Sequence, residues 1–159
     1  MPADPLQLFE KAKFQHHAAS HLLNTTYPVV KDPRLFLGVI GNLVTAADYA
    51  TQAVLEHLHQ QKKIPVYGKT LSSQILMLRS NVAQKYNLET KHILLILELR
   101  NLLEQHKKSP VEFQRGERFV ICDEEFRYKM VGVKELRSNV EEINNFLAKI
   151  KSIITTGGI

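Results

Sequence analysis

Arg100 and His106 are the two residues of this chain whose types and spacing could do chemistry. The fork of N–H donors on an arginine guanidinium can hold a phosphate group. A histidine can exchange a proton near neutral pH. Together they could cleave RNA without a metal ion, with the 2′-hydroxyl as nucleophile and Arg100 holding the phosphate. Arg100, its neighbour Asn101 and His106 are therefore the candidate catalytic residues.

The spacing of the pair restricts how such a site could form. The segment 90–110 (TKHILLILELRNLLEQHKKSP) is apolar nearly all round, which is typical of a buried central helix. On a straight helix, six residues correspond to about 240° of rotation and about 9 Å of rise, so Arg100 and His106 lie on different faces. They could converge only if the helix unwinds near 104–106, or if two chains each supply a pair.

A structural role for the same residues is the alternative. Arg100 and Glu104 have the i,i+4 spacing of a helical ion pair, and Glu104 can also reach Lys108. His106 would then cap the core at the end of the helix.

Two acidic residues of an earlier long helix, Asp48 and Glu56, are further candidate partners for Arg100. A buried arginine needs such a partner, because an isolated buried charge is costly. Either carboxylate could neutralise Arg100 across the bundle or could face water, and the sequence leaves both options open.

The segment around Arg100 resembles the motif of the HEPN family of helical domains. That motif is Arg, a short spacer that often begins with Asn, and then His, and residues 100–106 (RNLLEQH) have this pattern. The alanine-rich segment 43–58 (LVTAADYATQAVLEHL) is similar to the second helix of that family. The similarity covers residues 5–108.

This resemblance implies a function and a set of roles. Family members with the motif are often metal-independent ribonucleases that work as dimers, with both motifs lining a cleft, whereas others bind nucleotides or RNA without cleaving. It implies that Arg100 binds phosphate, Asn101 positions it and His106 is the general acid and base. The chain departs from the family in two ways. A tyrosine often follows the histidine there, whereas residues 107–110 are KKSP here, and the β-hairpin is an addition.

Histidines on the first two helices could form a metal site, but their surroundings do not favour one. His17 and His21 are one helical turn apart, as in zinc-binding helices, yet no HExxH glutamate and no cysteine pair accompany them. A Gly-rich phosphate loop is also absent from the sequence, so we expect neither a metal site nor a cofactor. The histidines considered are His16, His17, His21, His57 and His59.

Residues 111–131 alternate and are rich in aromatic and β-branched side chains. This pattern predicts an antiparallel hairpin of 118–122 with 126–131, and a further strand at 111–113. Interleaved basic and aromatic residues can bind nucleic acid, although the alternation favours aromatic side chains that pack inward onto helices. The candidate nucleic-acid-binding residues are Lys107, Lys108, Arg115 and Arg118.

Apolar residues recur at helical spacing in five segments. Asp4-Pro5 begins the first helix, because Asp caps a helix and Pro fits its first turn, and residues 24–28 (NTTYP) are expected to end it. The last helix has the cleanest period. The expected helices span about 5–24, 34–61, 70–86, 90–107 and 133–154. The sequence predicts a mainly α, up-and-down four- or five-helix bundle with a small antiparallel β-hairpin at about 118–131, forming one domain over residues 1–159.

Composition and patterning set the remaining expectations. A net charge of +5 favours nucleic acid without requiring it. The single Cys122, the lack of a signal-peptide pattern and the short apolar runs predict a cytoplasmic protein that does not enter a membrane. The apolar stripe of the last helix and the small-residue face of the second exceed what one core needs, which predicts a homodimer. We expect a HEPN-like domain that acts on or binds RNA; the alternative is a non-catalytic module that dimerises or binds a partner protein.

Overall fold

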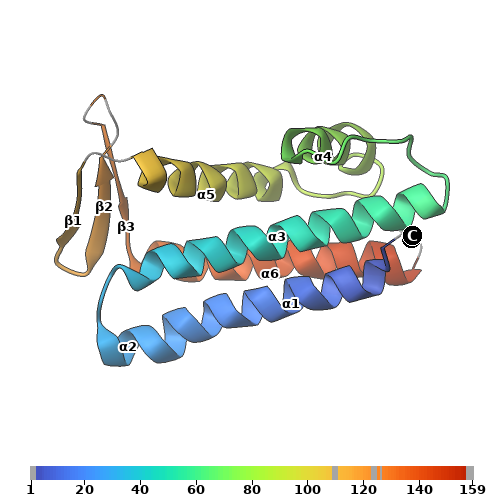
Figure 1. Ribbon diagram of the computed structural model, residues 1–159. Coiled ribbons are helices and arrows are strands. Elements are labelled where there is room, and N and C mark those ends of the chain that lie inside the picture. Colours follow the sequence, from blue (N-terminus) through green and yellow to red (C-terminus); the bar gives the residue numbers. More distant parts are fainter. Residues whose placement is uncertain (1–2, 109–110, 123–124, 126, 157–159) are drawn as a thin grey trace.

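The protein is a mainly helical bundle with a small antiparallel sheet before the last helix, as the sequence predicts (Figure 1). The computed structural model describes residues 3–108, 111–122, 125 and 127–156. The helices are α1 (Pro5–His21), α2 (Tyr27–Val30), α3 (Leu35–Gln60), α4 (Leu71–Met77), α5 (Thr90–Lys108) and α6 (Val133–Thr156), with π-helical turns η1 (Leu22–Thr26) and η2 (Leu78–Val82). The strands are β1 (Val111–Arg115), β2 (Arg118–Cys122) and β3 (Tyr128–Val131).

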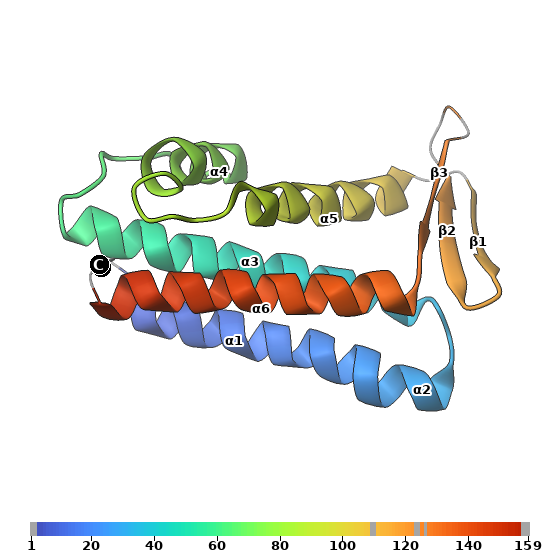
Figure 2. The same ribbon diagram turned by 180° about the vertical axis from the view of Figure 1, so that it is seen from behind.

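The long helices lie along one common direction. α1, α3 and α6 run side by side, and α5 lies alongside α3 and α6 on the side away from α1 (Figures 1 and 2). The sheet and α4 lie at opposite ends of the bundle (Figure 1). Because α5 contacts both α3 and α6, its polar side chains can find partners on either helix. Within the described ranges, no helix has the length and apolar character needed to cross a membrane.

The first helical segment begins as expected but continues further. The Asp4 side chain accepts a hydrogen bond from the Leu6 N–H at 3.0 Å, which caps α1. Helical backbone then passes through η1 into α2, and ends only at Lys31, whose φ of 55° is left-handed. Proline is tolerated in the first turn of a helix, so Pro28 lies at the start of α2. The expected end near residue 24 is therefore wrong.

The centre of the bundle is formed by α3 and α6. The alanines at 46, 47, 50 and 53 are fully buried on α3, which allows neighbouring helices to approach closely. On α6, most of the apolar stripe from Leu136 to Ile154 is also buried, and Val140 is partly buried. These two faces are thus packed largely within one chain, so the described residues of α3 and α6 do not provide the surplus of apolar surface from which the homodimer was predicted. The homodimer itself stays a prediction.

The sheet has the strand order β1-β2-β3, with both pairs antiparallel. Glu112 lies opposite Ile121, and Phe119 lies opposite Val131. Strand β1 extends the third strand expected at 111–113 to Arg115, while residues 123, 124 and 126 of the expected hairpin lie outside the described residues. Phe119 and Ile121 join the helical core, so the sheet closes one end of the bundle.

The third helical segment is shorter than expected. Thr70 caps α4 by accepting a hydrogen bond from the Ser73 N–H at 3.2 Å. The backbone then continues as the π-helical η2 and, after it, as turns that end at Asn87. The φ of Asn87 is 57°, which is the left-handed conformation expected of an asparagine that ends a helix. A loop leads from there to α5, the helix that carries the candidate catalytic residues.

Candidate functional site

Arg100 lies on the side of α5 that faces α3. Its Nη2 donates a hydrogen bond to Oδ1 of Asp48 and forms an ion pair with it. The Arg100 side chain is 19% exposed and that of Asp48 is 30% exposed, so the pair is largely enclosed. Of the open options for Asp48, the structure therefore has the one in which it neutralises Arg100 across the bundle.

Burial sets the electrostatics of this pair. Desolvation raises the pKa of Asp48 above its usual value, and the charge and hydrogen bond of Arg100 lower it only in part. The Nε atom of Arg100 is buried and has no hydrogen-bond partner among the described residues. A guanidinium in this position ties α5 to α3, because Nη2 is bonded to Asp48 and Nε is buried.

The expected i,i+4 pair of Arg100 with Glu104 is wrong. Glu104 instead pairs with Lys107, at 3.5 Å between Oε1 and Nζ, on the exposed side of α5. The reason is geometric: Arg100 faces the bundle, whereas Glu104 faces water. Glu56 also does not meet Arg100, because its carboxylate accepts hydrogen bonds from Gln60 and Tyr67.

His106 lies in the last turn of α5 and has its own partner. Its Nδ1 is 2.5 Å from Oε2 of Glu112, which lies on β1. The side chain of His106 is 39% exposed and that of Glu112 is 24% exposed. An ionised carboxylate can only accept a hydrogen bond, so Nδ1 carries the proton, and the lone pair of a neutral imidazole lies on Nε2. This orientation by a carboxylate is the one found in general acid–base catalysis.

The candidate catalytic residues are not brought together within one chain. α5 is helical without interruption to Lys108, so the unwinding near 104–106 that would let Arg100 and His106 converge does not occur. Asn101 is on the exposed side of the helix. Only the second route remains for a shared site, in which two chains each supply a pair.

The candidate nucleic-acid-binding residues fall into two groups. Lys107 and Lys108 are exposed and follow His106 directly at the end of α5. Arg115 and Arg118 are exposed cross-strand partners at the β1–β2 turn, about 10 Å from Glu112 along the strand. Arg118 also pairs with Glu135 of α6 at 3.5 Å, so its charge is partly neutralised.

The aromatic residues of the sheet have different environments. Phe119 is buried in the core, as the alternation predicts, whereas Tyr128 is 63% exposed. The side chains of Phe113 and Phe126 lie outside the described residues. An exposed tyrosine between basic residues is the part of the sheet that fits base stacking.

Comparison with protein-family models, curated proteins and solved structures gives no match. The likeness to HEPN domains therefore depends on the two sequence segments 100–106 and 43–58 alone.

Histidines of α1 and α3 contact different parts of the protein. His16 is buried, with Nε2 at 2.9 Å from the Val140 carbonyl oxygen of α6. His59 packs edge-on against Tyr67, with ring centroids 6.0 Å apart. Burial lowers the pKa of His57, which favours its neutral form. No group of three or more metal-ligating side chains is found in the part of the chain that the structure describes.

Two contacts of α5 were missed by sequence reasoning. The first is His106 with Glu112, for which the only available signal was the helix stop at Ser109-Pro110 between them. The second is His92, which is 4% exposed and contacts Glu142 of α6 at 2.9 Å. His92 and Lys91 both lower the pKa of Glu142. No local pattern connects residues 50 positions apart, so the second pair had no signal.

Proposed function

We propose that this chain is a HEPN-like helical domain that binds RNA where α5 meets the sheet, and cleaves it with His106 as general acid and base. The observation that carries the proposal is the contact of 2.5 Å between His106 Nδ1 and Glu112 Oε2. It holds a half-exposed imidazole in one orientation and leaves Nε2 directed away from its carboxylate partner. We call His106, Glu112, Lys107 and Lys108 the α5–β1 site.

The reaction follows from the chemistry of these groups. Neutral His106 takes the proton of a ribose 2′-hydroxyl at Nε2, and the 2′-oxygen forms a bond to the adjacent phosphorus. The P–O5′ bond breaks, and the imidazolium returns the proton to the departing 5′-oxygen. The products are a 2′,3′-cyclic phosphate and a 5′-hydroxyl. Glu112 stabilises the imidazolium, and the two lysines attract the phosphate backbone.

Arg100 has a different part in this proposal from the one that the family resemblance implies. Its ion pair with Asp48 and its burial support a structural role, in which it fixes α5 on α3. The same observation favours the second candidate function, a non-catalytic helical interaction module. The two candidates differ in whether the α5–β1 site binds RNA.

An RNA-binding titration tests the proposal. Fluorescence anisotropy with a mixed-sequence single-stranded RNA would compare the wild type with a variant that carries Lys107→Gln and Lys108→Gln. We expect weaker binding, and a salt dependence reduced by roughly 0.7 in slope for each lost phosphate contact. The matched control carries Lys149→Gln and Lys151→Gln, which remove the same charge from the far end of α6. Equal affinities and equal slopes for the two variants would contradict the proposal.

A further inference from the structure

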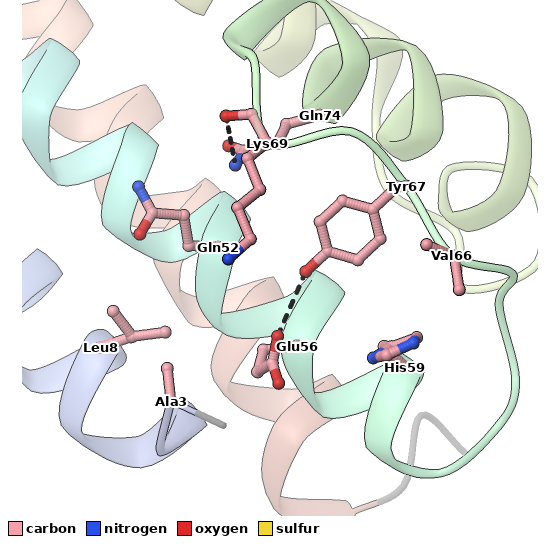
Figure 3. A pocket seen from close by; sticks show the side chains of 9 residues that line it. All are labelled: Ala3, Leu8, Gln52, Glu56, His59, Val66, Tyr67, Lys69 and Gln74. Carbon is pink, nitrogen blue, oxygen red and sulfur yellow. Dashed lines mark hydrogen bonds between the residues drawn. The ribbon is translucent and has the colours of Figure 1, made fainter. Parts of the chain in front are cut away.

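A pocket of about 420 Å³ lies beside α4 and the C-terminal half of α3 (Figure 3). This is the end of the bundle opposite the sheet (Figure 1). Its walls come from the start of the chain, from the C-terminal half of α3, from the loop after α3 and from α4. We call it the α3–α4 pocket. Its volume is in the range of small-molecule sites, and none of the residues of the α5–β1 site lines it.

A carboxylate is held in a fixed position inside this pocket. Oε1 of Glu56 accepts a hydrogen bond from Gln60 Nε2 at 3.2 Å, and Oε2 is 3.4 Å from the Tyr67 hydroxyl. Gln60 is itself fixed, because its Nε2 also donates to the carbonyl oxygen of Ala3 at 2.9 Å. Figure 3 shows the Glu56 carboxylate beneath Tyr67, within the group of lining side chains.

Tyr67 contributes a hydrogen-bond donor, its hydroxyl, and its ring lines one side of the pocket. Burial, with the nearby Glu56 charge, raises the pKa of Tyr67 to about 12, so its hydroxyl stays protonated near neutral pH. The ring is packed edge-on by His59. The phenol therefore keeps donating toward Glu56.

A positive charge reaches the same pocket from the loop. In Figure 3 the Lys69 side chain extends toward Gln52, on the side of the pocket opposite His59. Among the described residues, Lys69 forms no ion pair with Glu56 or with another carboxylate. The pocket thus presents a negative and a positive group that do not neutralise each other directly, with apolar contacts available from Leu8 and Val66.

We propose that the α3–α4 pocket binds a free α-amino acid, with the ligand ammonium group on Glu56 and its carboxylate on Lys69. A ligand that carries both charges satisfies both residues at once, whereas an amine or an acid alone leaves one of them without a partner. Gln52 can hydrogen-bond to the ligand, and Leu8 and Val66 can contact an aliphatic side chain. This site is independent of RNA binding at the other end of the bundle.

Calorimetric titration of the full chain with each of the twenty protein amino acids tests this inference. We expect at least one to bind with a Kd of about 1 mM or tighter. Its N-acetyl form and its carboxamide form, which each lack one charge, should both bind at least roughly tenfold more weakly. Failure of all twenty to bind would overturn the proposal, as would equal binding of either blocked form.

Substitutions locate the binding to the pocket. Glu56→Gln and Lys69→Met should each weaken binding of the same amino acid by roughly tenfold or more. Glu141→Gln and Lys151→Met, which change exposed charges on α6, are the matched controls and should leave the affinity unchanged. His106→Ala should also leave it unchanged, which separates this proposal from the RNA proposal. Wild-type affinity in either pocket variant would overturn the assignment.

Discussion

At the scale of single residues, Arg100 and His106 have separate carboxylate partners and therefore separate roles. Asp48 pairs with Arg100 between α3 and α5, where the Arg100 side chain is largely buried. Glu112 instead orients His106, whose side chain is more exposed to solvent. A motif that places Arg and His six residues apart does not by itself make them one site. The two partners, on α3 and β1, decide what each side chain can do.

A double-mutant cycle tests the structural role of Arg100. We expect Arg100→Met and Asp48→Asn each to lower the free energy of unfolding by about 1–3 kcal/mol, because each leaves a half-buried partner without its counter-charge. The double variant should lose less unfolding free energy than the sum of the losses in the two single variants. The control pair, Glu104 with Lys107, is well exposed, and its cycle should give a coupling of about 0–1 kcal/mol. Urea denaturation measures all four proteins of each cycle, and additivity at Arg100 and Asp48 would contradict the role.

The pH dependence of that cycle has a definite sign. The pKa of Asp48 is already raised by burial, and the loss of Arg100 should raise it further, because the opposing positive charge is removed. A carboxyl group with a raised pKa destabilises the fold where it must ionise, and does so less as the pH falls through that pKa. The cost of Arg100→Met should therefore be smaller in acid than at neutral pH. A cost that is constant or larger in acid would contradict the assignment of Asp48 as its partner.

Tyr67 offers a second test at this scale. Its pKa of about 12 lies above the ordinary value of 10.0, so the folded state retains a proton that the unfolded state loses first. Any stability from this proton is complete below pH 10 and disappears as the pH rises toward 12. Phenolate absorbance should show a late-titrating tyrosine in the wild type that is missing in Tyr67→Phe. If the tyrosine that is missing in Tyr67→Phe titrates at the ordinary pKa of 10.0, the burial of the Tyr67 hydroxyl beside Glu56 is contradicted.

At the scale of elements, α5 is the helix that positions the candidate catalytic residues. Contacts with α3 and α6 fix its rotation, through Arg100 on one side and His92 on the other. That rotation determines which residues of the motif face the bundle and which face water. Asn101 is on the exposed side as a consequence, and His106 is placed at the junction with β1.

The close packing of α3 gives a prediction for this scale. Ala50 is fully buried on α3, so Ala50→Leu should overpack the bundle and cost about 1–3 kcal/mol of unfolding free energy. Ala148→Leu, at an exposed position of α6, is the matched control and should change stability by less than about 0.5 kcal/mol. Denaturation and light scattering would be measured on both variants. Unaltered stability of Ala50→Leu would contradict the close packing of α3 within one chain.

At the scale of the whole molecule, local patterns predicted the architecture, and they predicted the partners of the site residues only in part. The helical period of 133–154 predicted α6, and the alternation after 111 predicted the sheet. The period did not show that the apolar stripe of α6 would be buried within one chain. Arg100 shows why the site was harder. The i,i+4 rule favoured Glu104, and Asp48 was only one of the open alternatives. Asp48 is the partner, but it is 52 residues away and becomes a neighbour only when α5 packs on α3. Glu112 lay close in sequence, yet its contact depends on how β1 is placed against the end of α5.

RNA cleavage by wild type, His106→Ala and Arg100→Met tests the central claim most directly. The substrate is a mixed-sequence single-stranded RNA, with a 2′-deoxy strand as the control that lacks the nucleophile. The account predicts 2′,3′-cyclic phosphate products from the wild type, a loss of roughly 100-fold or more in His106→Ala, and near-normal rates in Arg100→Met at temperatures where it is folded. No cleavage by the wild type, or equal rates for the wild type and His106→Ala, would contradict it.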